Sequence, residues 1–434
     1  MSKIKRTILV YSNATKMGHR DLFETNFYSY LEKNYNVSWL FDDQPIKHFI
    51  KNRKNYHIVK IKQNIRFLFW TYLFYLEEIE IKKKHDPKKI YKNSRLYINK
   101  FNKKIIELIY FLKLHKLVKI ILGHLLNKSF VNYDFFTGTD LFISISTGKD
   151  LLADDLARNA KKRNIPFFFI PAGWDHISGK PILVKPDKIF VWGEQTKKLC
   201  RNIHNQDSEI IGSFKFDIYN KNISRSKALN KLNLNKNYKY ILICGSVVVF
   251  NEKKLINKIL KYLKSKNKKN YRIIYKPHPF AMKRMFDENI NFNMPNKVIM
   301  SEKIKKEFEL KDYPYLLNSI EGIITPYSTM IVEALFHNIP CMTVGYTEKN
   351  QYNFDWKLHS DIAPHLKILK NKEFIINCAN EKNFDRNFKS FLNLIDNRKK
   401  YISDMKYLTN KVVFRSKGTF NDRIKNVVDK YLTK

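Results

Sequence analysis

Residues 322–344 read GIITPYSTMIVEALFHNIPCMTV, and this stretch decides the fold. The apolar runs Gly322 to Ile324 and Pro340 to Val344 each predict a strand. Between them, Ser328 to His337 combines a small polar start with an apolar body, which predicts a buried helix. A strand, a helix and a strand in succession are typical of a parallel sheet, so the sequence predicts an α/β fold here.

The same alternation runs through most of the chain. Residues 4–41 predict a strand, a loop, a helix and a second strand, and residues 140–212 and 238–344 continue the rhythm. The sequence therefore predicts two Rossmann-like α/β domains. The expected segments are an N-terminal domain at 1–217, an Asn- and Lys-rich linker at 218–237, a C-terminal domain at 238–383 and C-terminal helices at 384–434.

The composition excludes several classes of protein. The chain has 434 residues, of which 44% are hydrophobic, and this allows a substantial core and excludes a disordered chain. Its four scattered cysteines form no CxxC pair, so neither a disulfide scaffold nor a zinc ribbon is expected. Residues 4–11 predict a first strand rather than a secretory signal. We expect a cytoplasmic protein.

The chain is strongly basic, with 81 Lys and Arg against 40 Asp and Glu and a net charge of +41. Such a surface attracts polyanions, including nucleic acid, anionic lipid and phosphorylated substrates. Most of the basic residues are lysines spread along the whole chain, which equally fits a solvated lysine surface. The sequence contains no zinc-finger spacing, RNP-type strand or basic zipper, so no specific nucleic-acid partner is expected.

Residues 62–127 interrupt the α/β rhythm with helical patterns, so we expect a helical insertion in the N-terminal domain. The aromatic run Phe67 to Leu76 is too short to span a bilayer. Residues 105–126 carry lysines between apolar stripes. Two interpretations stay open: the helices pack on the domain, or their basic amphipathic face makes peripheral contact with the anionic inner face of the cytoplasmic membrane.

The predicted strand Tyr271 to Tyr275 ends in the turn Lys276-Pro277-His278-Pro279. In open α/β sheets, ligands bind outside the carboxyl ends of the strands. The two prolines stiffen the turn around His278, and Lys276 supplies a cation beside it. A rigid imidazole and a cation suit a phosphate group. A surface histidine in a proline-rich turn is the structural alternative.

A second candidate turn opens the helix quoted above. Ser328 and Thr329 lie at its predicted N-terminus, where free N–H groups and the helix dipole favour an anion. Glu333 lies about one helical turn further on, where its carboxylate could accept hydrogen bonds from ribose hydroxyls. The alternative is an ordinary N-cap followed by a solvated glutamate. Two anion-suited turns after two strands of one domain favour a nucleotide site.

These segments resemble the donor domain of GT-B glycosyltransferases. The KPHP turn and TPYSTMIVEALFHNIPCMTV are similar to motifs of bacterial surface-polysaccharide enzymes, in the CDP-glycerol glycerophosphotransferase-like, sialyltransferase-like and Kdo-transferase-like groups. AGWDHISGKPILVKPDKIFVWGEQTKKLC (172–200) and IIGSFKFD (210–217) are similar to the end of the N-terminal domain in such enzymes. The resemblance covers about residues 140–345 and implies two Rossmann-like domains facing a cleft.

The resemblance also implies roles for particular residues. The chain has Ser-Thr where sialyltransferases have Ser-Ser, so the choice among a CMP-, CDP- or UDP-linked donor stays open. No cofactor and no metal are expected, because Lys, His and the helix dipole would replace a cation. His278 is expected to act in catalysis, and the residues expected to bind the donor nucleotide are Gly245, Ser246, Lys276, His278, Pro279, Ser328, Thr329 and Glu333.

The base that deprotonates the acceptor hydroxyl is expected in the N-terminal domain. Asp175 and His176 follow the predicted strand Pro166 to Ile170 and are the first catalytic candidates, with a purely structural corner as the alternative. His19, Arg20 and Asp21 follow the first strand and are expected to bind the acceptor.

The sequence thus predicts a metal-independent glycosyltransferase. It would move a sugar or polyol phosphate from a nucleotide-activated donor to a glycan or lipid-linked acceptor during biosynthesis of a surface polysaccharide, such as capsule or lipopolysaccharide. Two alternatives remain. One is a nucleotide-sugar 2-epimerase, which needs no acceptor, and the other is a basic nucleic-acid-binding protein.

Overall fold

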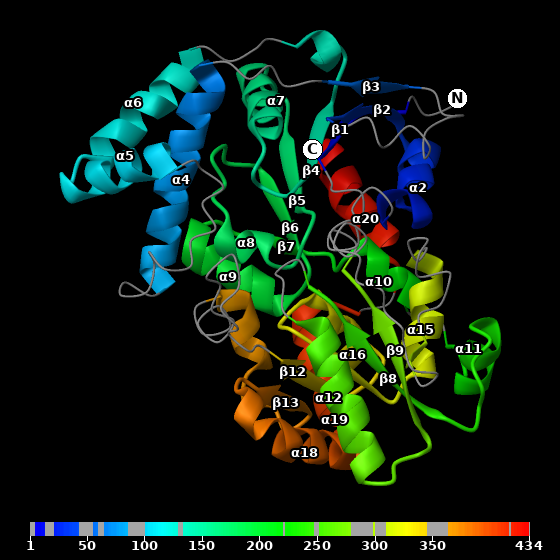
Figure 1. Cartoon of the computed structure of the whole chain (residues 1–434). Coiled ribbons are helices and arrows are strands. Elements are labelled where there is room, and N and C mark those ends of the chain that lie inside the picture. Colours follow the sequence, from blue (N-terminus) through cyan, green and yellow to red (C-terminus); the bar gives the residue numbers. More distant parts are fainter. Residues whose placement is uncertain are drawn as a thin grey trace. The chain divides into compact units, whose positions relative to one another are not determined.

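A computed structural model shows two compact units, one made of Met1–Asp217 with Val413–Lys434 and the other of Ile218–Val412. Figure 1 shows the helices and strands of each unit. The structure describes residues 5–13, 21–42, 55–59, 65–85, 100–128, 133–219, 222–246, 251–278, 298–299, 310–344, 363–415 and 418–433.

The first unit is built on a parallel sheet with the strand order β3-β2-β1-β4-β5-β6-β7. The order reverses between β1 and β4, and doubly wound sheets bind their ligands at such a reversal. The strands are β1 (Thr7–Asn13), β2 (Asn36–Phe41), β3 (Tyr56–Ile58), β4 (Leu141–Ser146), β5 (Phe167–Pro171), β6 (Lys188–Val191) and β7 (Glu209–Ile210).

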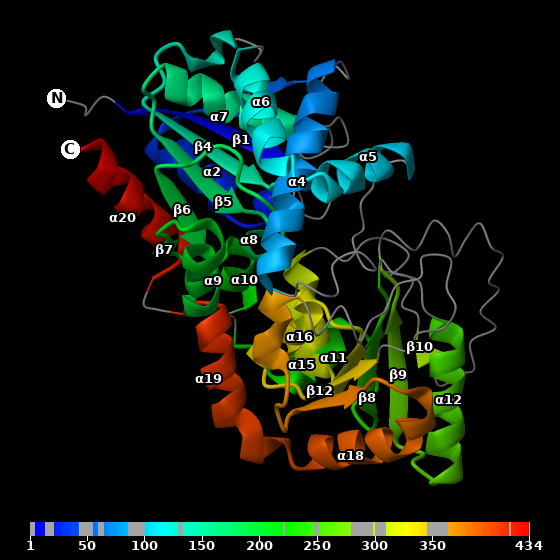
Figure 2. The same ribbon diagram turned by 90° about the vertical axis from the view of Figure 1, so that its left-hand side faces the viewer.

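Helices cover both faces of this sheet (Figures 1 and 2). Helices α2 and α20 pack on one face, and α7 and α9 pack on the other. The helices of this unit outside the insertion are α2 (Phe27–Asn34), the short 3₁₀ turn η2 (Asp134–Phe136), α7 (Leu151–Lys162), α8 (His176–Gly179), α9 (Glu194–His204), α10 (Phe214–Tyr219, which runs across the unit boundary) and α20 (Phe420–Leu432).

Helix α20 belongs to the first unit although the whole second unit precedes it in the chain. Its residues Phe420, Ile424 and Val428 are spaced four apart, lie on one helical face and are fully or almost fully buried. Burying each of these side chains contributes about 1.5–3 kcal/mol. The core of the first unit is therefore completed by a segment that lies far away in the sequence.

The predicted helical insertion is present between β3 and β4 as α4 (Ile65–His85), α5 (Lys100–Phe111) and α6 (His115–Lys128). Arg66 of α4 donates two hydrogen bonds, of 2.8 and 2.7 Å, to the Asp155 carboxylate on α7, and both side chains are buried. Such a bidentate pair fixes orientation as well as distance. The insertion is therefore anchored to the α7 face of the first unit. None of the helices in the described ranges is long and apolar enough to cross a membrane.

The second unit contains a parallel sheet with the order β10-β9-β8-β11-β12-β13. This is the 3-2-1-4-5-6 order of a Rossmann fold, and it reverses between β8 and β11. The strands are β8 (Lys239–Cys244), β9 (Tyr271–Lys276), β10 (Val298–Ile299), β11 (Gly322–Thr325), β12 (Cys341–Val344) and β13 (Ile375–Cys378).

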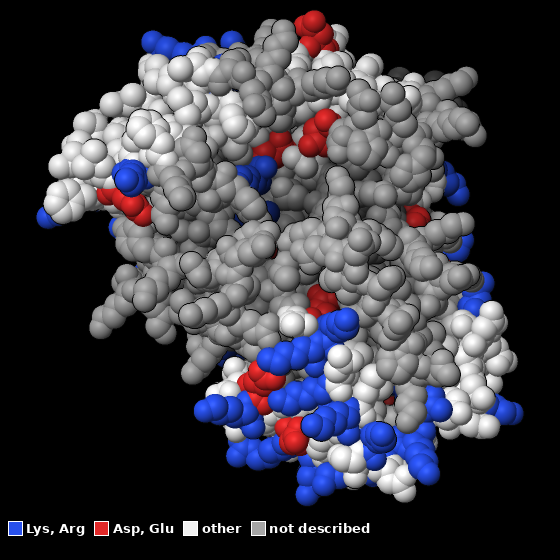
Figure 3. Space-filling model, in the orientation of Figure 1, with Lys and Arg blue, Asp and Glu red and all other residues white. Residues whose placement is uncertain are grey.

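Helices α12 and α18 pack on one face of this sheet, and α16 lies on the other with α19 against it (Figure 2). Exposed lysines line the solvent side of α12, where blue side chains gather in Figure 3. The helices are α11 (Arg225–Lys231), α12 (Glu252–Ser265), α15 (Tyr313–Ser319), α16 (Thr329–Phe336), α18 (Phe384–Asp396) and α19 (Ile402–Val412), with 3₁₀ turns η3 (Leu310–Asp312), η4 (Pro364–Leu369), η5 (Glu381–Asn383) and η6 (Arg398–Tyr401).

Two predicted segments differ from the structure. Residues 218–237, predicted as a linker, contain α11, whose Arg225 forms an ion pair of 2.8 Å with Glu321, so this segment is part of the second unit. Residues 384–434, predicted as one group of C-terminal helices, divide after Val412 between the two units. In both cases the reason is packing against distant residues, which local composition does not reveal.

Candidate functional site

Three turns leave the second sheet at one edge. Cys244 of β8 is in register with Lys276 of β9, and Ile243 is in register with Ile324 of β11. The last residues of these neighbouring strands therefore lie at one level, with strands about 4.8 Å apart. The turns after β8, β9 and β11 all start there, at the point where the strand order reverses and where ligands bind in such sheets.

The turns after β8 and β9 are in direct contact through Gly245. Its N–H donates a 2.9 Å hydrogen bond to the Lys276 carbonyl. A Cβ at this position would lie 2.7 Å from a Glu252 carboxylate oxygen and 2.9 Å from the His278 backbone nitrogen. Only glycine lets these backbones approach so closely. The predicted residues Gly245, Ser246 and His278 are thus brought together.

Lys276 lies beneath these turns and is only 8% exposed. Burial alone would lower the pKa of its ammonium group. The nearby Tyr313 and Cys244 side chains and the Glu333 carboxylate outweigh burial, so the pKa of Lys276 is raised and the group stays cationic at neutral pH. This gives the carboxyl edge a fixed positive charge.

Ser328 is the N-cap residue of α16, but its side chain does not cap the helix. Its hydroxyl instead pairs with the Thr325 hydroxyl at 3.2 Å. The first N–H groups of a helix have no acceptor inside the helix. With Thr329 as the first helical residue, this start leaves backbone donors for an anion, and the helix dipole adds to the attraction.

Glu333 is buried in α16, with 5% of its surface exposed. Its carboxylate accepts a 2.9 Å hydrogen bond from the Tyr219 hydroxyl, and it interacts electrostatically with Lys276. The Glu333 carboxylate therefore helps to keep the Lys276 ammonium charged. The predicted contact of Glu333 with a ribose stays a prediction.

Glu252, the first residue of α12, was not among the predicted site residues. Its carboxylate accepts hydrogen bonds from the Tyr275 hydroxyl and from the Ser246 N–H, the latter at 3.3 Å. Burial raises the pKa of Glu252 to about 7, although both hydrogen bonds act in the opposite direction. A glutamate at a predicted helix start was the only available signal. A titratable carboxyl therefore lies under the β8 turn.

Pro279 lies outside the described residues, as do His19 and Arg20 of the predicted acceptor group. Asp21 is described and starts a short helical turn before α2, with its carbonyl accepting a 3.3 Å hydrogen bond from the Thr25 N–H. The predicted acceptor role of these residues stays a prediction.

Asp175 and His176 lie just after β5, at the carboxyl edge of the first sheet. The His176 Nδ1 atom accepts a 3.0 Å hydrogen bond from the Gly173 N–H, so a neutral ring carries its proton on Nε2. That nitrogen lies 3.8 Å from Asp175 Oδ1. With Nδ1 engaged, the imidazole is poorly placed to take a proton. The geometry therefore favours Asp175, whose side chain is 54% exposed, over His176 as a base.

No family model matches the sequence, and no curated protein matches it. Solved structures do match, over nearly the whole chain. A glycosyltransferase from Rickettsia africae ESF-5 matches with a TM-score of 0.51 and 13% identity, covering 100% of both chains. A UDP-N-acetylglucosamine 2-epimerase from Rickettsia bellii matches with a TM-score of 0.53 and 16% identity, covering 99% of this chain and 98% of that one. The wall teichoic acid polymerase TagF matches with a TM-score of 0.52 and 11% identity, covering 99% and 90%.

These likenesses show the fold. The chain has a GT-B-like fold of two Rossmann-like α/β units with a helical insertion in the first, and the predicted fold class is confirmed. Identities this low do not extend to a family or a reaction. The particular activity depends on the residues of the site.

Proposed function

We propose that the chain is a nucleotide-sugar-dependent glycosyltransferase. The observation that carries this proposal is the convergence of three turns, a buried Lys276 ammonium and the uncapped start of α16 at one edge of the second sheet. A cation and several backbone N–H donors at a strand-order reversal suit the phosphates of a nucleotide. The matching structures named for sugar transfer and UDP-sugar chemistry support the same ligand class.

In this proposal, each residue has a defined part in transfer. The acceptor hydroxyl oxygen attacks the anomeric carbon while the bond from that carbon to the phosphate oxygen breaks. The acceptor proton goes to a base of the first unit, for which Asp175 is the favoured candidate. Lys276, His278 and the α16 amides stabilise the negative charge that develops on the leaving phosphate. We propose no metal for this step, since these groups supply positive charge and hydrogen-bond donors.

A sugar-nucleotide 2-epimerase is the second candidate, because one of the matching structures carries that name. The two activities differ in their need for an acceptor. Incubating the protein with UDP-N-acetylglucosamine alone should leave the sugar configuration unchanged if the chain is a transferase. Conversion to the 2-epimer, or release of a free sugar, without any acceptor would establish the epimerase instead.

Binding of the nucleotide is the first test. CMP, CDP, UDP and GDP are added separately, and the melting temperature is recorded, because a ligand that binds only the folded state raises it. At least one nucleotide should stabilise the protein, and Lys276→Met should abolish that shift. Stabilisation by none of them, together with salt-sensitive binding to DNA, would favour the nucleic-acid alternative.

We also propose that the acceptor is lipid-linked and that the insertion holds the protein on an anionic membrane. Helices α5 and α6 carry a surface that we name the α5–α6 apolar face. Within the described residues nothing covers it, and Phe111 is 82% exposed. The corresponding area of Figure 3 is mostly free of charged side chains. The face consists of Phe101, Leu108, Phe111, Leu112, Leu114, Leu117, Ile120 and Ile121.

Charge favours a membrane as the occupant of this face. Exposed lysines at 104, 113, 116 and 128 belong to the same two helices and their connection, and the chain carries a net charge of +41. Two copies of the chain meeting through this face would bring like charges together. An anionic lipid surface instead receives both the apolar side chains and the lysines.

A further inference from the structure

The Glu252 carboxyl group lies directly under the turn after β8, at the edge where the donor phosphates are proposed to bind. A Cβ atom on Gly245 would lie 2.7 and 2.8 Å from its two oxygens. The carboxyl group accepts hydrogen bonds from the Ser246 N–H, at 3.3 Å, and from the Tyr275 hydroxyl. One acidic side chain at the start of α12 therefore joins the turn after β8 to the end of β9.

No cation pairs with Glu252 among the residues that the structure describes. Lys254 and Lys258, further along α12, form ion pairs with Glu381 instead, at 3.0 and 3.4 Å. Lys253 is exposed to solvent. An ionised Glu252 would therefore keep a negative charge in a partly buried place without a partner, and such a charge is costly.

The other titratable groups around Glu252 do not balance its charge. Burial raises the pKa of the Cys244 thiol on β8 to about 12, so this group is neutral. The pKa of the Tyr275 hydroxyl on β9 is raised by burial and by Glu252 itself. The Lys276 ammonium interacts with groups other than Glu252, and His278 approaches the turn after β8 through its backbone nitrogen. Neutralising Glu252 therefore requires a proton.

A donor pyrophosphate bound at this edge would bring further negative charge close to Glu252. Like charges near one another favour the neutral form of a carboxyl group. Burial already raises the pKa of Glu252 to about 7, so adding the proton near neutral pH costs little. The neutral acid can still accept hydrogen bonds from the turn, and its O–H can in addition donate one to a phosphate oxygen.

We propose that Glu252 takes up a proton when the nucleotide sugar binds, and that the neutral acid holds the Gly245–Ser246 turn and donates its new O–H to a donor phosphate. The proton comes from the solvent, and no covalent bond of the donor forms or breaks in this step. Glu252 thereby joins the donor-binding residues. The proposal rests on the transferase function proposed above and adds to it that donor binding tightens as the pH falls through neutrality.

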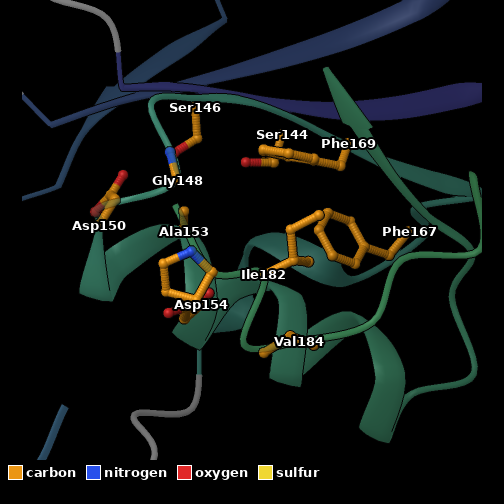
Figure 4. Close-up of a pocket in the computed structure, with 11 residues that line it drawn as sticks. Ser144, Ser146, Gly148, Asp150, Ala153, Asp154, Phe167, Phe169, Ile182 and Val184 are labelled. Carbon is orange, nitrogen blue, oxygen red and sulfur yellow. The ribbon is translucent and has the colours of Figure 1, made fainter. Parts of the chain in front are cut away.

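Asp154 in the first unit is a comparable acid in a different setting, and it supplies the matched control. Burial raises its pKa to about 7 as well, and it accepts a 2.6 Å hydrogen bond from the Trp70 ring N–H. It lines a space between β4, β5 and α7 (Figure 4) of about 20 Å³, which has room for roughly one water molecule. A phosphate does not fit there, so Asp154 should titrate without responding to the donor.

Isothermal titration of the full chain tests the proposal. The probes are UDP-N-acetylglucosamine, CDP-glucose, CMP-N-acetylneuraminic acid and GDP-mannose, whose esterified phosphates keep their charge between pH 6 and pH 8. Titrations at pH 8 in HEPES and in Tris, which differ in heat of ionisation, reveal any proton taken from the buffer. We expect uptake of at least about half a proton per bound probe. With a pKa of about 7 in the free chain, affinity should also fall about five- to tenfold from pH 6 to pH 8.

Three variants assign the proton. Glu252→Gln imitates the neutral acid, so it should bind at pH 8 about as tightly as the wild type does at pH 6, with no proton uptake. Asp154→Asn should leave both the uptake and the pH dependence unchanged. His278→Ala should bind more weakly but should keep the uptake, because its imidazole is not the group that gains the proton.

Proton uptake that persists in Glu252→Gln, or that disappears in His278→Ala, would overturn the proposal, as would wild-type binding that does not change with pH. The outcome also separates this inference from the proposed function. If a probe binds without proton uptake, only the assignment of Glu252 fails. If none of the four probes binds, the proposed function fails and this inference fails with it.

Discussion

The Tyr219 hydroxyl donates a 2.9 Å hydrogen bond to the Glu333 carboxylate. Tyr219 is the last residue of α10, the helix in which the chain passes from the first unit to the second. Glu333 interacts in turn with Lys276 at the candidate phosphate site. The connecting segment is therefore hydrogen-bonded to a carboxylate that acts on the proposed phosphate-binding lysine.

Tyr219→Phe should test this link. Removing the hydroxyl deprives a buried carboxylate of a donor, which should cost about 1–3 kcal/mol in the free energy of unfolding. We expect a lower urea midpoint and weaker nucleotide binding, because Glu333 is free to reposition Lys276. Tyr407→Phe, at a side chain that is 63% exposed, serves as the control and should change neither quantity. Equal stability of the two variants would contradict the structural role of Tyr219.

Lys276→Met and His278→Ala address the phosphate site itself. Each should weaken nucleotide binding at least tenfold, the loss expected for a hydrogen bond to a charged group. His278→Ala should lose most transfer activity while the fold survives. Lys276→Met should also destabilise the fold, since it leaves the Glu333 carboxylate without its cation.

Isothermal titration measures the affinity of these variants for the nucleotide, with Lys264→Met, on the exposed side of α12, as the control. Near-normal turnover by folded His278→Ala would remove this residue from the mechanism.

Glu252→Gln should change how stability depends on pH. The pKa of Glu252 is about 7 in the folded chain, above its ordinary value of 4.5. The folded state therefore holds the proton more tightly, and this carboxyl reduces stability as pH rises from about 4.5 through 7. Glutamine stays neutral and avoids the penalty. The variant should match the wild type near pH 4 and exceed it by about 1–3 kcal/mol at pH 8 in urea unfolding. A constant difference across this range would contradict the assignment.

Gly245→Ala should disturb the contact between the turns after β8 and β9. The added methyl group would lie within 2.9 Å of Glu252 and of the His278 backbone, so one of them must move. We expect at least a tenfold loss in nucleotide affinity, with a cost of about 1–3 kcal/mol in stability for overpacking. Gly179→Ala is the matched control, because nothing lies within 4 Å of its new Cβ. If the nucleotide raised the melting temperature of both variants equally, the close approach of Gly245 to Glu252 and to the His278 backbone would be contradicted.

Phe111→Ser combined with Ile120→Ser should weaken binding to vesicles that contain anionic lipid. Both side chains are at least 70% exposed, so the core should be unaffected, while the loss of apolar contact should reduce vesicle binding at least tenfold. Sedimentation with vesicles measures the bound fraction, and vesicles of neutral lipid should bind less. Tyr407→Ser controls for the loss of an exposed aromatic side chain. The wild type could instead fail to bind vesicles and form a dimer that the double variant does not form. This result would contradict the membrane proposal and show that a second copy of the chain covers this face.

The strands and the ligand-facing turns could be predicted because their signals are local. Tyr271 to Lys276 and Gly322 to Thr325 are mostly apolar runs, each followed by a proline, and the alternation with helices predicts a parallel sheet. Once strands are parallel, their carboxyl ends share one edge. That Lys276 to His278 and the Ser328 turn leave the sheet at the same edge follows from that rule and from the observed order β9-β8-β11.

The other site features depend on contacts between distant residues. Glu252 appears as an ordinary first-turn glutamate until β9 places Tyr275 beside it. The hydrogen bond from Gly173 to His176 depends on the conformation of one turn, and the same residue types elsewhere would leave the imidazole available. The short strand Tyr56–Ile58 lacks an apolar run and is defined by its pairing with β2. None of these features has a periodic signature.

The return of α20 to the first unit sets an order for folding during synthesis. The ribosome delivers all of Ile218–Val412 before it delivers Phe420, Ile424 and Val428. The second unit can therefore fold as soon as Val412 has been synthesised. The first unit begins earlier in the sequence, but its hydrophobic face stays uncovered until α20 has been synthesised. A nascent chain interrupted at Val412 should accordingly depend on chaperones. The first unit produced alone should fold and stay soluble only when the α20 segment is supplied, either joined after Asp217 or added as a separate peptide.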